Sequence, residues 1–363
     1  MTVQPVQPIT AKVRKFPCEN CGADIRWDPG VSALKCPYCG AVKQVGVAAT
    51  AILEKPIDAG LRAPRDLGWG AERKVVACKR CGAHTTLDPH VSASRCAFCG
   101  TSAIVEAPAD PNVIRPEGLL PFGVPKNNAL QQFRGWQGTL WFRPNDLKSS
   151  SRLTEMQGVY IPFWTFDAAT HSQWTADAGY SYYVSVRGSD GKQRQERRIR
   201  WESAAGSLEL FFDDVPVPAS RGIDPGLARG IEPFPTADLT PYEPSYLSGF
   251  LAEENAVDLP EALETAKGRM RDDIRAACSE DVPGDTQRNL QVQSTFSGVS
   301  YKNALLPIWI AAYEYRGQPY RYIVNGVTGK AHGNAPWSAV KIFFAVLTAM
   351  IVGVIVLSIM SQS

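Results

Sequence analysis

Eight of the nine cysteines in this 363-residue chain fall into two copies of one spacing pattern. The pattern is C-x2-C-x14-C-x2-C, formed by Cys18, Cys21, Cys36 and Cys39 and again by Cys78, Cys81, Cys96 and Cys99. A glycine follows the second and fourth cysteine of each copy, and glycine permits the positive φ that lets two nearby thiolates face one ion. Four thiolates complete a tetrahedral ion and leave no position for water. The spacing therefore predicts two closed, structural Zn²⁺ sites.

The two copies also match between their cysteines. Ala23 corresponds to Ala83, Asp28-Pro29 to Asp88-Pro89, and Val31-Ser32-Ala33 to Val91-Ser92-Ala93. A repeat of this kind indicates duplication of one folding unit. Each unit is too short to bury a core of its own and needs its metal to fold. We therefore expect two small β zinc ribbons.

Two alternatives to zinc are open at this stage. Disulfides would suit a secreted domain, but residues 1–16 are polar and lack the apolar core of a signal peptide. A reducing compartment would keep the cysteines free. Iron in a rubredoxin-like site uses the same four ligands. Outside the pattern, Cys278 is expected to be a small core residue, and His84 and His90 to be solvated loop residues.

Ile342–Met360 is an apolar run of nineteen residues without a charge. As a helix rising about 1.5 Å per residue it spans ~28 Å, close to the ~30 Å hydrocarbon core of a bilayer. We predict a transmembrane helix over residues 339–360 that anchors the chain by its tail. Glu314 is the last acidic residue, and the cations beyond it precede the run. The positive-inside rule then places the N-terminal body in the cytoplasm, at a bacterial inner membrane that the chain crosses once.

The rest of the sequence predicts an α+β fold. Val159–Ala168 is rich in aromatic and β-branched residues and indicates a buried strand. Leu259–Cys278 is an amphipathic helix, and seven prolines between Asp213 and Tyr246 predict an ordered, extended segment. Three runs near the end predict a closing antiparallel sheet: Ser294–Tyr301, Leu305–Tyr315 and Pro319–Val324.

These signals divide the chain into six parts. We expect a disordered N-terminus (1–15), a first zinc ribbon (16–45), a flexible linker (46–74), a second zinc ribbon (75–107), a mixed, mainly antiparallel α+β domain (108–336) and the transmembrane helix (339–360). The ordinary apolar content, 44%, allows the middle domain to bury a core.

Charge and missing motifs limit the functions to consider. Residues 1–110 carry fourteen Lys and Arg against ten Asp and Glu, but two tetrathiolate zinc sites contribute −4 and cancel that surplus. Nucleic-acid binding through the ribbons is therefore possible but not favoured. Gly326–Lys330 lacks the spacing of a phosphate-binding loop, and no hydrolase, metalloprotease or dinucleotide motif occurs. We predict no catalytic residues and no enzymatic activity.

The chain resembles a family of bacterial membrane proteins with doubled zinc ribbons, often labelled primosomal-helicase-like or transcription-factor-IIB-type. The resemblance rests on the ribbons and on Tyr160–Ala168, Phe212–Val215, Val217–Ser220, Tyr246–Phe250, Leu306–Trp309 and Val324–Lys330. Helicase motifs are absent, so the label carries no activity. The resemblance implies a membrane-tethered adaptor, in some members associated with envelope-stress or scaffold proteins of the membrane surface.

The function expected from the sequence is that of a zinc-binding adaptor or scaffold. It would present both ribbons at the cytoplasmic membrane surface to a cytoplasmic or membrane-associated protein partner. Membrane-tethered nucleic-acid binding through the ribbons is the alternative. A steep loss of affinity with added salt would distinguish the alternative from protein binding.

Overall fold

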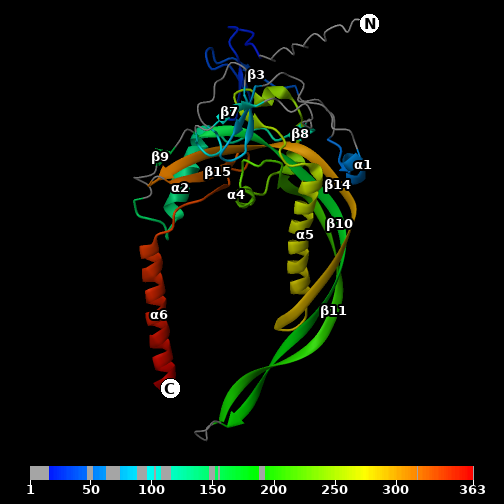
Figure 1. Cartoon of the computed structure of the whole chain (residues 1–363), viewed down its shortest axis with the longest axis vertical. Coiled ribbons are helices and arrows are strands. Elements are labelled where there is room, and N and C mark those ends of the chain that lie inside the picture. The colour runs from blue at the N-terminus through cyan, green and yellow to red at the C-terminus, as the bar shows by residue number, and fades with distance from the viewer. Residues whose placement is uncertain are drawn as a thin grey trace.

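The computed structural model describes residues 16–46, 52–62, 74–87, 96–101, 104–107, 116–146, 152–153, 156–187, 193–316 and 318–362. Three long strands dominate this part of the chain: β10 (Gln157–Arg187), β11 (Gln193–Pro218) and β14 (Thr286–Tyr315). β10 lies between the other two and pairs antiparallel with both. Beyond residue 179, β10 pairs with β11 alone, and we call this part, residues 180–187 and 193–200, the arm. The arm extends away from the body of the molecule (Figure 1).

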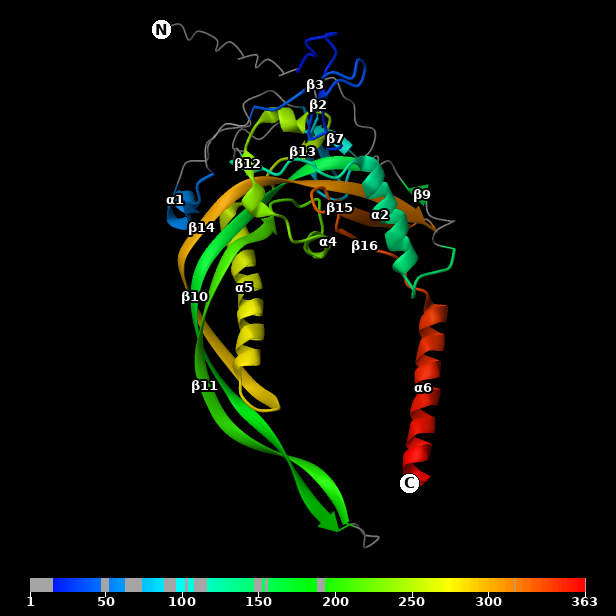
Figure 2. The same ribbon diagram turned by 180° about the vertical axis from the view of Figure 1, so that it is seen from behind.

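The long strands curve because bulges interrupt their pairing. The register of β10 with β11 shifts beside Asp167, and the register of β10 with β14 shifts there and again at Ala176. Each bulge contains one residue with positive φ: Asp214 in β11, and Asn289 and Gly298 in β14. Bulges of this kind bend a strand and increase its twist. The sheet therefore arches over the body (Figure 2).

One helix covers the concave side of the arch. α5 (Leu259–Asp281) begins at Asp258, whose side chain accepts a hydrogen bond from the Glu261 N–H at 3.0 Å. Its buried residues follow helical spacing: Leu259, Ala262, Leu263, Ala266, Met270, Ile274 and Cys278. They pack against inward residues of the long strands, including Trp164 and Trp174. Cys278 is fully buried, as predicted.

The first cysteine module, residues 16–46, has its own three-stranded antiparallel sheet. It consists of β1 (Arg26–Asp28), β2 (Ala33–Lys35) and β3 (Val42–Lys43). The second cysteine module includes β5 (Lys74–Cys78), β6 (His84–Leu87) and β7 (Ile104–Ala107). β6 pairs with β13 (Leu251–Glu253), which in turn pairs with β10, so this module continues the main sheet. The prediction for His84 is wrong in part: its side chain is exposed to solvent, but the residue lies in strand β6 and not in a loop.

Part of the stretch expected as a flexible linker is folded onto the main sheet. β4 (Lys55–Pro56) pairs with β14 at Ser300 and Tyr301, and α1 (Ile57–Arg62) follows it. A Cβ on Gly60 would lie 2.4 Å from the Tyr301 ring, so a glycine is required at this contact. Linker residues 47–51 and 63–73 lie outside the described part of the chain.

Smaller elements complete the body. The helical ones are α2 (Lys126–Thr139), α4 (Pro225–Gly230) and the 3₁₀ helices η1 (Thr236–Asp238) and η2 (Pro244–Leu247). The strands are β8 (Gly118–Leu119), β9 (Arg152–Leu153), β12 (Thr240–Pro241), β15 (Gln318–Asn325) and β16 (Ala331–Gly333). The described sheet has 13 strands and is mainly antiparallel, with parallel pairing of β10 with β13 and of β14 with β8. The predicted α+β class is therefore confirmed.

α6 (Ala339–Gln362) leaves the body as a separate rod on the same side as the arm (Figures 1 and 2). Its first turn is held by the loop that follows α2. The Phe142 carbonyl accepts a hydrogen bond from the Ser338 N–H at 2.9 Å, and the Arg143 guanidinium lies 3.7 Å from the centre of the Trp337 ring. Lys341 Nζ donates to the Trp141 carbonyl at 2.9 Å.

Candidate metal centres

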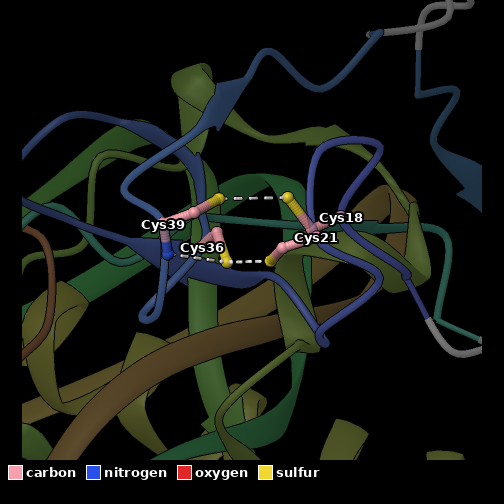
Figure 3. Close-up of side chains that lie close together, drawn as sticks. All are labelled: Cys18, Cys21, Cys36 and Cys39. Carbon is pink, nitrogen blue, oxygen red and sulfur yellow. Dashed lines mark hydrogen bonds between the residues drawn. The ribbon is translucent and has the colours of Figure 1, made fainter.

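The first cysteine module brings its four sulfurs together from two glycine-terminated turns. Gly22 and Gly40 have φ of +74° and +76°, and their N–H groups donate to the Cys18 and Cys36 carbonyls. Each turn thereby points its two thiols at a common centre (Figure 3). Sγ of Cys18 lies 3.5 Å from Sγ of Cys39, and Sγ of Cys21 lies 3.5 Å from Sγ of Cys36.

The second cysteine module repeats this arrangement. Gly82 and Gly100 have φ of +74° and +69° and close the same hydrogen-bonded turns. The Sγ–Sγ distances are 3.6 Å for Cys78 with Cys99 and 3.7 Å for Cys81 with Cys96. All eight cysteines that the spacing pattern selected therefore fall into two groups of four, as predicted.

These distances fit one tetrahedral ion in each group. A tetrahedron with metal–sulfur bonds of about 2.3 Å places its sulfurs about 3.8 Å apart. A disulfide would need a sulfur–sulfur distance of about 2.05 Å, and all described cysteines are free. The geometry therefore favours metal over disulfide bonding.

Backbone N–H groups prepare Cys36 to act as a thiolate ligand. The backbone nitrogen of Cys39 lies 3.5 Å from Sγ of Cys36 and donates a hydrogen bond to it. This hydrogen bond, together with one from the Tyr38 N–H, lowers the pKa of Cys36 to about 6. In the second group, a hydrogen bond with Cys96 and burial raise the pKa of Cys81. A bound cation replaces such shared protons, because metal ligation deprotonates thiols.

The two centres differ in exposure. Cys21 and Cys39 of the first group are exposed to solvent, whereas Cys78, Cys96 and Cys99 of the second are buried. This difference arises because another segment of the same chain covers the second centre, which lies in a core cluster with Ile223 and Leu227 of the body.

The first module nevertheless packs on the body through one face of its sheet. Trp27 is 8% exposed, its indole N–H donates to the Phe122 carbonyl at 2.9 Å, and its ring lies 4.8 Å from that of Tyr246. Ser248 adds two backbone contacts, accepting from the Trp27 N–H and donating its hydroxyl to the Ile25 carbonyl. This docking could not be predicted from the repeat, because Trp27 has no aromatic counterpart in the second copy.

A third group of potential ligands lies at the bulge beside Asp167. Carboxylate oxygens of Glu54, Asp167 and Asp213 come within 4.8 Å of one another. Burial, with Glu54 nearby, raises the pKa of Asp167 to about 6. Lys302 already supplies a cation here, with Nζ 2.8 Å from Asp214 and 3.1 Å from Glu54. This cluster therefore fastens the linker to the sheet, and its members are too far apart in sequence to be recognised as a group.

The remaining histidines and the basic residues of the arm do not form a further site within the described part of the chain. His90 lies outside the described residues, and His171 lies on the sheet 3.5 Å from Glu209. On the arm, Arg198 and Arg200 make exposed ion pairs with Glu196 and Glu202. Pairs of this kind contribute little to stability. The arm is a solvated hairpin whose described residues carry five arginines and one glutamate.

α6 is long and apolar enough to cross a membrane. The window Ala339–Val356 meets that test, and none of it is buried against the rest of the chain. A core helix of similar composition would be covered by other elements. The span is the one that the sequence predicted.

Comparison with known proteins gives one distant relative. The chain is 27% identical over 230 residues to an uncharacterized protein, YdjG, of Bacillus subtilis (strain 168). The alignment covers 63% of this chain and 66% of that protein. No family model matches the chain, and no solved structure is similar to it.

Proposed function

We propose that this protein is a membrane-anchored adaptor whose two cysteine modules are zinc ribbons. Zinc is the cation best suited to four thiolates at tetrahedral spacing in a closed centre. The observation that supports it most directly is the 3.5 to 3.7 Å spacing of sulfurs from opposite turns. With all four positions filled by protein, each ion is structural, and what the modules offer a partner is a rigid surface.

The anchor in this proposal is α6, which places the modules beside a bacterial inner membrane. The first module lies at the end of the body opposite to the point where α6 leaves it (Figure 1). Confinement to a surface raises the effective concentration of two partners there. Individually weak protein contacts then suffice for assembly.

Truncation tests the anchor. Deleting residues 339–363 should move the chain from the membrane fraction to the soluble fraction, while native mass spectrometry still finds two zinc ions. A matched deletion of the arm, residues 181–199, should leave the chain in the membrane fraction. A truncated chain that stays membrane-bound would refute anchoring by α6, and a metal-free full-length chain would refute the zinc assignment.

The position of the arm limits how α6 can be oriented relative to the body in a bilayer. α6 and the arm extend from the same side of the body, and the arm carries Arg194, Arg197 and Arg198 (Figure 2). An open hairpin with charged residues does not enter hydrocarbon, because its edge N–H and carbonyl groups would lose their water. We infer that α6 changes direction relative to the body when it inserts, and that the contacts of Trp337 and Lys341 with the loop after α2 break when it does so. A nitroxide spin label in place of Tyr183 of the arm should then stay accessible to a water-soluble paramagnetic relaxation agent in nanodiscs, measured by electron paramagnetic resonance. Protection of the label from that agent would contradict this inference.

A further inference from the structure

The two cysteine modules carry equivalent aromatic residues in very different surroundings. Tyr38 lies between the last two cysteines of the first group, and Phe98 occupies the same position in the second. Phe98 is 1% exposed, and Tyr38 is 82% exposed. The duplication allows a direct comparison, because the covered copy shows what kind of segment such a turn accepts.

In the second module the cover is a tight turn of the body, residues 220–223. Gly222 lies against Ala83 and Phe98 so closely that a Cβ would come 2.6 Å from the Ala83 Cβ and 3.0 Å from the Phe98 ring. The Ser220 hydroxyl accepts hydrogen bonds from the Gly222 and Ile223 N–H groups and fixes the turn. Ile223 then adds its side chain to the same core cluster.

Among the described residues, no such turn covers the equivalent surface of the first module. Ala23, which corresponds to Ala83, is only partly buried, and Tyr38 is exposed to solvent. A Cβ on Gly22 would meet nothing within 4 Å, whereas at the equivalent Gly82 it would approach Arg221 of the covering turn at 3.9 Å. The face left open is the one that the second module buries.

Tyr38 also has the chemistry of a contact residue. Its ring offers apolar area at small entropic cost, and its hydroxyl is compatible with water until a partner binds. Tyrosine is enriched in protein interfaces and in their energetic centres. The surface lies on the module farthest from α6, where a cytoplasmic protein can reach it (Figure 1).

We propose that the surface at Ala23 and Tyr38, equivalent to the one that residues 220–223 cover in the second module, is a docking site for a partner protein. The partner presents a glycine-containing turn followed by an aliphatic residue, equivalent to Gly222-Ile223 of this chain. The inference rests on the proposed adaptor function and specifies the surface through which it acts. The glycine is required because any side chain at that position would collide with the alanine and the ring.

A peptide with the sequence of residues 217–229 is the probe for this site. Labelled with fluorescein, it should bind saturably to the zinc-loaded full chain in nanodiscs, measured by fluorescence anisotropy. Tyr38→Ala should weaken binding at least tenfold, whereas Tyr38→Phe should retain it. The matched control is Tyr183→Ala, because Tyr183 is an exposed aromatic residue of the arm. A peptide with Gly222→Val should not bind.

Two results would overturn the proposal. One is the absence of saturable peptide binding at protein concentrations up to the millimolar range. The other is peptide binding that Tyr38→Ala leaves unchanged, which would show that the peptide binds at another site. Either result is separable from failure of the adaptor function, because metal content and membrane fractionation are measured on the same samples. A photo-crosslinking residue at position 38 in intact membranes extends the test. Adducts on this chain itself or on lipid would also overturn it.

Discussion

Glu253 offers the sharpest test of the energetics of this fold. It lies in β13, where the second cysteine module joins the main sheet, and it is fully buried. Neither carboxylate oxygen makes a hydrogen bond of good geometry with the described residues. Burial raises its pKa to about 8, although the Ser220 hydroxyl and the His84 and Gly222 N–H groups partly oppose the shift.

The sign of the pH dependence follows from that shift. A carboxyl whose folded pKa is raised binds its proton more tightly in the native state than in the unfolded state. Its contribution to stability is therefore complete at low pH and falls as the pH rises from about 4.5 to about 8. Each tenfold change in proton affinity corresponds to about 1.4 kcal/mol. Keeping Glu253 protonated at pH 7 thus costs the native state about 3 kcal/mol relative to acidic solution.

Glu253→Gln tests this calculation, because glutamine has the shape of the protonated acid and does not titrate. Between pH 5 and pH 7.5 the unfolding free energy of the wild type should fall relative to that of the variant by about 3 kcal/mol. Urea denaturation of the zinc-loaded chain, followed by tryptophan fluorescence, measures the difference, and metal effects common to both proteins cancel. Glu209→Gln is the control, since that side chain is 84% exposed on the sheet. Parallel pH curves for wild type and Glu253→Gln would refute the reasoning.

Four further substitutions test the cysteine modules. Trp27→Ala removes a buried indole and its hydrogen bond to Phe122, so it should destabilise docking of the first module by about 3 to 5 kcal/mol, measured by urea denaturation. Tyr38→Ala, at an exposed site, should change stability by less than about 0.5 kcal/mol. Cys36→Ser and Cys96→Ser should each lower the zinc content from two ions to one by native mass spectrometry; a fall to none in either variant would contradict separate centres.

The two groups of four cysteines could be predicted from the sequence because their chemistry is local. Four thiolates must approach one point, and glycine at positive φ after each pair enforces the turn, so the spacing alone identifies them. The apolar span was equally local, since its length and lack of charge are properties of one helix. The acidic cluster at Asp167 was not predictable in this way. Its members are brought together by pairing of β4 with β14 and by a bulge in β11.

The long strands show why pattern reasoning divides a sheet too finely. Ser294–Tyr301 and Leu305–Tyr315 were expected as separate strands, but both belong to β14. The expected break at residues 302–304 is continuous strand, and Asn289 and Gly298, whose residue types also occur in turns, occupy bulges with positive φ within β14. A bulge and a turn place the same local demand on the backbone, and only pairing with β10 distinguishes them. In the proline-rich stretch the expectation of an extended segment was wrong in part, because Pro225 and Pro244 begin the short helices α4 and η2.

The same distinction between local and distant information applies to the duplicated modules. Their cysteines, glycines and shared turns specify one local structure, and both copies adopt it. What differs is the surface that each copy meets: Thr86 of the second copy donates its hydroxyl to Ala252 of β13, while the first copy uses Trp27 to dock elsewhere on the body. Substitutions that leave the metal centre unchanged therefore decide which face of each module is buried. Only a comparison of the two modules in the folded chain shows that a face is exposed in one copy and covered in the other. Neither the sequence repeat nor the structure of one module contains that information.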